Sequence, residues 1–130
     1  MTPQALLDEC IRRIIAQEPS SAASVEKWKS SNRARLLVWS EHLLGLLAKG
    51  SQPPATELID RVTRRAQRDY PDEAAWLRRY RDVMVLFADI AMQQSALDSE
   101  QTVSPTRASE RIAANIQAAR IAMQPGQATR

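Results

Sequence analysis

The sequence contains few of the residues from which reactive centres are built. It has one cysteine, one histidine and three glycines among 130 residues. One cysteine cannot form an internal disulfide, and structural zinc sites draw on several cysteines and histidines. Phosphate-binding loops need clustered glycines ahead of a helix, whereas Gly45, Gly50 and Gly126 lie far apart. The sequence therefore predicts no metal site and no nucleotide cofactor.

The two residues best suited to nucleophilic or acid–base chemistry are more simply explained by packing. Cys10 lies among Leu7, Ile11 and Ile14, a pattern typical of a small buried side chain. His42 flanks an apolar stripe, where a packed or half-exposed histidine is more common than a catalytic one. We therefore expect no catalytic residue, no cofactor and no enzyme, and keep an enzyme of unfamiliar type as a second alternative.

Long apolar segments are absent as well. The longest apolar runs, residues 43–48 and 83–88, are far shorter than the stretch of about 20 residues that crosses a bilayer. Near the amino terminus, Leu7 is followed at once by Asp8 and Glu9, which leaves no apolar region of a signal peptide. The sequence predicts a cytoplasmic protein without membrane association.

What is present favours helix. Hydrophobic residues make up 44% of the chain and charged residues 25%, as in an ordinary globular domain, and the helix formers alanine, leucine, arginine and glutamine are abundant. The pattern predicts an all-α, single-domain bundle of about five helices over residues 1–124, with a disordered tail at 125–130. The expected helices cover residues 3–18, 25–49, 55–69, 72–97 and 105–124. The second is expected to continue through Asn32, although a break with a new N-cap at residues 30–32 is the alternative.

The segment 72–97 is expected to be the long central helix. Its apolar residues recur at steps of one, three and four, and therefore share one broad face of a helix. They are Trp76, Leu77, Tyr80, Val83, Met84, Phe87, Ile90 and Ala91. A helix of this length would extend about 39 Å, enough to span a small domain, and we expect the other helices to pack around it.

Arginine is the sharpest charge feature of the sequence. The net charge is +3, fifteen of the eighteen basic residues are arginine, and acidic residues are interleaved with them. Four arginines in the helix predicted at 55–69 are spaced i, i+3, i+4 and i+7, so they share one face. They are Arg61, Arg64, Arg65 and Arg68, a candidate surface for anions or for an acidic partner. A solvated helix face, partly neutralised by nearby carboxylates, is the simpler explanation.

The last helix, residues 105–124, has a narrow apolar stripe after a long polar connection. It is expected to dock on its own bundle by default, or to act as a mobile arm that docks on a second copy or on another protein. The candidate docking residues are Ile112, Ile116, Ile121 and Met123.

These observations favour a non-enzymatic protein that works by binding another protein. It would be an adaptor, a chaperone-like protein or a regulatory antagonist, with the formation of homo-oligomers as a possible extension. The alternative is a nucleic-acid-binding regulator that uses the four arginines of residues 55–69. The sequence does not identify the partner.

Overall fold

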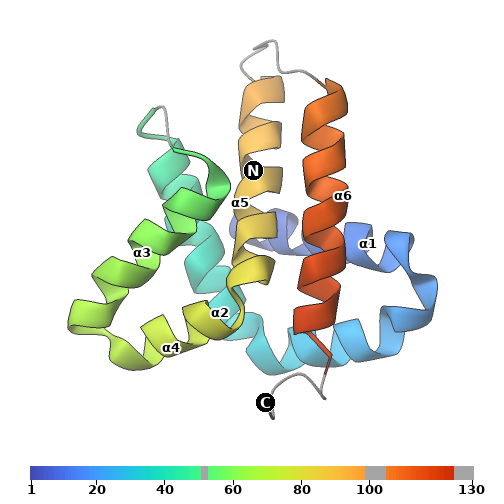
Figure 1. Cartoon of the computed structure of the whole chain (residues 1–130), viewed down its shortest axis with the longest axis horizontal. Coiled ribbons are helices and arrows are strands. Elements are labelled where there is room, and N and C mark those ends of the chain that lie inside the picture. The colour runs from blue at the N-terminus through green and yellow to red at the C-terminus, as the bar shows by residue number, and fades with distance from the viewer. Residues whose placement is uncertain (51–52, 99–104, 125–130) are drawn as a thin grey trace.

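The chain folds into helices, and proline or cap signals of the sequence mark only some of their ends. The computed structural model describes the backbone of residues 1–50, 53–98 and 105–124, and their side chains except those of 96–98 and 105–108. The elements are α1 (Pro3–Gln17), the short 3-10 helix η1 (Pro19–Ser21), α2 (Ala22–Leu47), α3 (Ala55–Asp69), α4 (Pro71–Arg79), α5 (Arg81–Asp98) and α6 (Pro105–Ala122) (Figure 1). The all-α class is confirmed, because no strand occurs in the described ranges.

Local chemistry sets several of these boundaries. The Thr2 hydroxyl accepts a hydrogen bond from the Ala5 backbone N–H at 3.1 Å, and Pro3 occupies the first turn of α1, where a missing N–H does no harm. Pro71 begins α4 in the same way. After α2, Gly50 adopts a φ of +119°, a conformation that side chains with a Cβ rarely take.

The prediction of one long helix over residues 72–97 is wrong. The predicted packing of the other helices around it is not confirmed. The chain leaves helical geometry at Tyr80 (φ −108°, ψ 32°), so the segment forms α4 and α5, and α4 lies across one end of α5 (Figure 1). The Tyr80 ring is buried between Trp28 and Trp76, with ring centroids 5.1 and 5.3 Å away. Arg81 at the start of α5 is held by Asp60 of α3. Tertiary packing therefore determines the bend, since no proline or glycine marks it.

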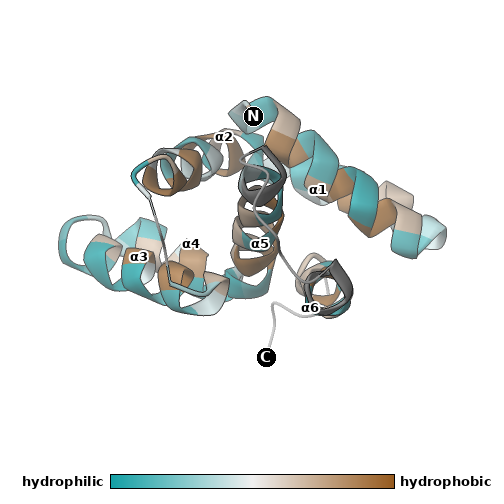
Figure 2. Cartoon of the chain, turned by 90° about the horizontal axis from the view of Figure 1, so that it is seen from above, coloured by the Kyte–Doolittle hydropathy of each residue, from teal (hydrophilic) through white to brown (hydrophobic). Residues whose placement is uncertain are grey.

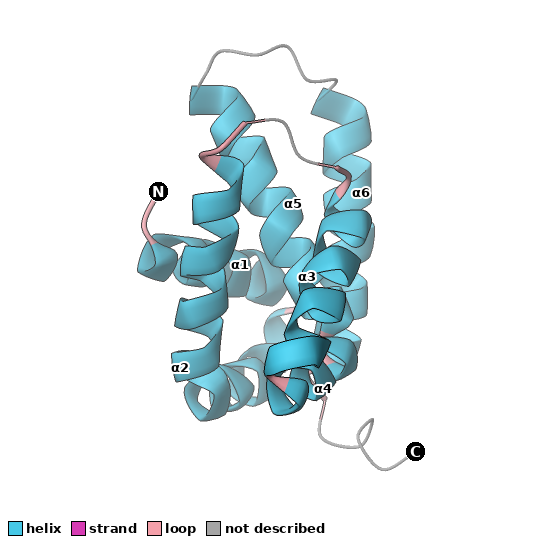
Figure 3. Ribbon diagram, turned by 90° about the vertical axis from the view of Figure 1, so that its left-hand side faces the viewer, coloured by secondary structure: helices cyan, strands magenta, loops and turns pink. Residues whose placement is uncertain are grey.

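The prediction that the second helix continues through Asn32 is confirmed. α2 covers 26 residues and changes direction along its length (Figures 1 and 3). Ser31 and Asn32 donate side-chain hydrogen bonds to the carbonyls of Lys27 and Trp28, at 3.1 and 2.9 Å. Such bonds back to the preceding turn bend helices without ending them.

α5 takes the central position, because it packs against every other α-helix (Figure 2). Its residues 83–88 are buried in succession, with no exposed face over this stretch. A helix that is buried all round belongs in the middle of a core. The same hydrophobic core contains residues from all six α-helices, and Cys10 and Phe87 are among its fully buried side chains.

α6 runs alongside α5 and crosses α1 (Figures 1 and 2). Polar contacts supplement the apolar packing, because Asp89 of α5 accepts hydrogen bonds from Arg111 and Asn115 of α6. Gln17 of α1 donates a bond of 3.0 Å to the carbonyl of Ala113. Within the ranges that the structure describes, no helix is apolar over a length sufficient to cross a membrane.

Glu9 on α1 gives a testable link between charge and stability. Arg12 and Arg13 donate hydrogen bonds to its carboxylate, and the bond from Arg12 is the main reason that the pKa of Glu9 falls from 4.5 to about 2. A carboxyl with a lowered pKa stabilises the fold above its unfolded pKa and loses this effect as the pH falls. Because the pairs are partly exposed, Glu9→Gln should lower the free energy of unfolding by only about 1 kcal/mol at pH 7.

Urea unfolding of wild type and Glu9→Gln at several pH values measures this effect. The difference between the two proteins should shrink as the pH is lowered from about 4.5 toward about 2. A difference that stays constant over that range would show that the carboxylate charge is not its origin.

Candidate functional site

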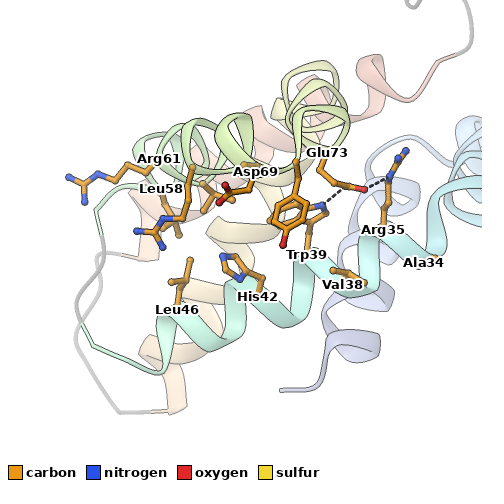
Figure 4. Close-up of a pocket in the computed structure, with 14 residues that line it drawn as sticks. Ala34, Arg35, Val38, Trp39, His42, Leu46, Leu58, Arg61, Asp69 and Glu73 are labelled. Atoms are coloured by element: carbon orange, nitrogen blue, oxygen red, sulfur yellow. Dashed lines mark hydrogen bonds and ion pairs between the residues drawn. The ribbon is translucent and has the colours of Figure 1, made fainter.

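A groove opens on the surface between α2 and α3. Each of these helices packs on α5, but they make few contacts with one another. The groove has a volume of about 630 Å³, within the range of about 300–1,000 Å³ that is usual for ligand clefts. We call it the α2/α3 groove. Its α2 wall consists of Ala34, Arg35, Val38, Trp39, His42 and Leu46, its α3 wall of Leu58, Arg61, Val62, Arg65, Ala66 and Asp69, and Tyr70 and Glu73 close one end (Figure 4).

The groove has an apolar floor and exposed apolar edges. Leu58, Val62 and Ala66 are buried on α3 at steps of four residues, so they form one continuous strip. Val38 and Tyr70 stand at the edges with 62% and 65% of their surface exposed. Of the four large hydrophobic residues exposed in the described part of the chain, these two line the groove. Exposed apolar surface that is concentrated in a concavity is typical of a binding site.

The Glu73 carboxylate fixes the closed end of the groove. It accepts hydrogen bonds from Arg35 Nε at 3.1 Å and from the Trp39 indole N–H at 3.2 Å, as the dashed lines in Figure 4 show. Both donors lie on α2, whereas Glu73 lies on α4, so these bonds tie the two helices together. Trp39 is only partly buried and stands in the α2 wall.

His42 lies in the middle of the α2 wall and makes an edge-on contact with Trp39, with ring centroids 5.6 Å apart. Its pKa lies below the ordinary value of 6.5, mainly because of desolvation and also because of the positive charges of Arg65 and Lys49. The imidazole is therefore neutral at pH 7. Among the described residues, no serine, threonine or cysteine lines the groove beside it, so none of them offers it a hydroxyl or thiol to activate.

No family model, curated protein or solved structure matches this chain. Any functional assignment therefore depends on the geometry and charge of the molecule itself. Among the side chains that the structure describes, no group of three histidine, cysteine, aspartate or glutamate residues is placed to hold a metal ion.

The four candidate arginines of α3 are all exposed, but they divide between two hollows. Arg61 is bonded to Glu57 at 2.7 Å and faces the groove. Arg65 lines both the groove and a smaller hollow beside it, which Arg64, Arg68 and Asp69 complete. The structure therefore brings three of the four arginines together and assigns Arg61 to the groove.

The candidate docking residues of α6 are placed differently from one another. Ile112, Ile116 and Met123 are only 4%, 7% and 3% exposed, because they pack into the core of their own chain. Ile121 alone of the four is exposed, at 41%. Sequence reasoning did not identify Val38, Tyr70 or Glu73 as site residues. A sequence feature that could have indicated the groove is Val38, an apolar residue of α2 that lies away from the buried face of this helix.

Proposed function

We propose that this protein is a non-enzymatic interaction module, of the adaptor, chaperone-like or regulatory-antagonist kind, that binds another protein in the α2/α3 groove. The observation that carries the proposal is the exposure of Val38 and Tyr70 above an otherwise buried apolar strip. Covering such a surface with a partner's apolar side chains would remove it from water, which is the main driving force of association.

The occupant that fits best is an amphipathic helix. The walls are themselves helices, whose backbone groups bond within each helix, so they offer no free sheet edge to an extended peptide. A helix satisfies its own backbone and needs only side-chain contacts. The wall residues from Ala34 to Leu46 cover about 18 Å of helix, or three turns. Apolar side chains at i, i+4, i+7 and i+11 of a partner helix would span about that length.

Charge complementarity indicates that the partner helix carries acidic side chains. Arg61 and Arg65 line the groove from α3. After desolvation, the positive charges of Arg65 and Lys49 also contribute to the lowered pKa of His42 on the α2 wall. Two carboxylates, Asp69 and Glu73, also line the groove, and Glu73 is already bonded to Arg35 and Trp39. A partner carboxylate beside Arg65 would therefore meet a positive potential, which favours both association rate and specificity.

Selection of helical peptides against the full chain tests the proposal. A library with randomised apolar and charged positions should yield binders with apolar residues at helical spacing and with glutamate or aspartate on one flank. Amide chemical-shift changes on binding should map to the groove-lining residues of α2, α3 and α4. Selection that yields no saturable binder, or binders that map to another face, would overturn the proposal.

The charge of the occupant can be tested separately. Arg65→Glu should weaken an acidic selected peptide about 10-fold, because a favourable contact becomes a repulsive one. Changing the facing acidic residue of the peptide to lysine should restore most of the loss. Glu41→Arg, a charge reversal on an exposed position of α2 outside the groove lining, serves as the control.

Duplex DNA tests the nucleic-acid alternative. If DNA binds at low salt with an affinity that falls steeply as salt rises, and Arg64→Glu/Arg68→Glu abolishes the binding, the arginines follow a phosphate backbone. That result, together with a groove that binds no helix, would favour a nucleic-acid-binding function over the binding of a partner protein.

A further inference from the structure

The hollow beside the groove has an unusual charge balance. Its lining consists of Arg64, Arg65, Arg68 and Asp69, around a volume of about 280 Å³. Three positive groups and one negative group give it a net charge of +2. Like charges at helical spacing repel one another, so this cluster reduces the stability of α3 unless an anion is bound.

Two carboxylates near the hollow, Glu57 and Asp60, are bonded to arginines outside it, although the charge of Arg64 also acts on Asp60. Glu57 pairs with Arg61 at 2.7 Å, and Asp60 pairs with Arg81 through two bonds of 2.8 and 3.1 Å. In the described ranges no carboxylate lies within ion-pair distance of Arg64, Arg65 or Arg68. Asp69 lines the hollow but forms no ion pair with them. The arginines therefore keep their donors free for an external ligand.

The chemistry of the hollow matches a phosphate better than a carboxylate. A phosphate monoester carries about −1.5 to −2 charges at pH 7 and three strong acceptor oxygens, which correspond to the net charge and to the three guanidinium groups. A carboxylate has one charge and two oxygens, so it would leave part of the charge unbalanced. Arginine forks bind phosphate oxygens in pairs, with directional bonds.

The hollow is also continuous with the α2/α3 groove, because Arg65 and Asp69 line both. A helix seated in the groove would therefore carry its flanking residue past Arg65 and into the hollow. We propose that Arg64, Arg65 and Arg68 form a phosphate-binding site, and that its ligand is a phosphorylated serine or threonine on the partner helix. The second half of this proposal rests on the proposed function, whereas the first half does not.

Inorganic phosphate tests the first half. In NMR titrations at constant ionic strength, the side-chain Nε–H signals of Arg64, Arg65 and Arg68 should shift and saturate with phosphate, but not with acetate or chloride. The Arg64→Gln/Arg68→Gln variant should lose saturation, while the control Arg12→Gln/Arg33→Gln, with the same change of charge, keeps it. Shifts that stay linear, or that acetate reproduces, would overturn the site.

A groove-binding peptide with serine, glutamate or phosphoserine at the position beside Arg65 tests the second half. The phosphoserine form should bind at least about 10-fold more tightly than the serine form, and Arg64→Gln/Arg68→Gln should remove that gain while leaving the serine form unaffected. Equal affinities would overturn the assignment of the ligand. Val38→Asp should lose the peptide but keep inorganic phosphate, so failure of the groove and failure of the phosphate site give different results.

Binding of duplex DNA is measured beside binding of inorganic phosphate and of the peptides. Tight, salt-dependent DNA binding without saturable binding of inorganic phosphate would show that the arginines follow a nucleic-acid backbone. That outcome would overturn the proposed site.

Discussion

Trp76→Ala is expected to lower the free energy of unfolding by about 3–5 kcal/mol, the usual cost of removing a large aromatic ring from a core. The Trp76 side chain is 7% exposed and packs against Tyr80, where the chain turns from α4 into α5. Its indole N–H also donates a 3.0 Å hydrogen bond to Asn32 Oδ1, in the middle of α2. One residue therefore connects the bend, the core and α2.

Three further tryptophan variants serve as controls. Trp39→Ala should cost much less, because this ring is only partly buried in the wall of the groove. Trp76→Phe should cost more than Trp28→Phe, since the buried N–H of Trp28 has no hydrogen-bond partner among the described residues to lose. Denaturant unfolding ranks the variants, and a larger cost for Trp39→Ala than for Trp76→Ala would contradict the described packing.

The second large effect is expected at the contact between α5 and α6. Asp89 is 2% exposed and is bonded to Arg111, with Nε 3.0 Å from Oδ1, and to Asn115. Arg111→Ala would leave a buried carboxylate with one partner fewer, and should lower the free energy of unfolding by about 2–3 kcal/mol. The control Glu110→Ala removes an exposed charge from the same helix and should change it by less than about 0.5 kcal/mol.

Asp89→Asn should behave differently from Arg111→Ala. Burial raises the pKa of Asp89 above its ordinary value of 3.8, although Arg111 and Asn115 act in the opposite direction. An acid whose pKa is raised on folding stabilises the fold below its unfolded pKa, and this contribution is lost as the pH rises through the folded value. At pH 7, Asp89→Asn should therefore keep the free energy of unfolding within about 1 kcal/mol of wild type.

On acidification the wild type should gain stability relative to Asp89→Asn. Urea midpoints at pH 7 and pH 4 measure the change. If the wild type instead loses stability relative to the variant over that interval, the Asp89 carboxylate is better stabilised by Arg111 and Asn115 than its burial indicates.

Sequence periodicity predicts the helices well where one face is buried. On α3, Leu58, Ile59, Val62 and Ala66 recur at steps of one, three and four and are all buried, because a helix that packs on one side places its apolar residues at such steps. On α6, Ile112, Ile116, Ala119 and Met123 are buried in the same way.

The break at Tyr80 could not be predicted from local pattern. The apolar periodicity continues from Trp76 to Val83 without proline or glycine. Helical hydrogen bonds continue up to the bend on both sides, from Tyr80 N–H to the Trp76 carbonyl and from Met84 N–H to the Tyr80 carbonyl. The bend depends on the contact of Tyr80 with Trp28, a residue 52 positions earlier, which no local window contains.

The groove could not be predicted because it depends on how two helices diverge. Val38 and Tyr70 are exposed apolar residues whose sequence positions indicate nothing about a shared site, and single exposed apolar residues are common. The four arginines of α3 could be recognised from their spacing. Their division between the groove and the hollow depends on the position of α2, which the spacing does not specify.

The dissociation constants of a selected helical peptide for wild type, Val38→Asp and Ile121→Asp show whether the partner helix binds in the α2/α3 groove. Both substitutions replace an exposed apolar residue by the same charge, one in the groove and one on α6, and both should leave the free energy of unfolding nearly unchanged. Val38→Asp should weaken binding about 100-fold, or about 2.7 kcal/mol, while Ile121→Asp keeps the wild-type affinity. Equal affinities of wild type and Val38→Asp, or a loss confined to Ile121→Asp, would contradict the account.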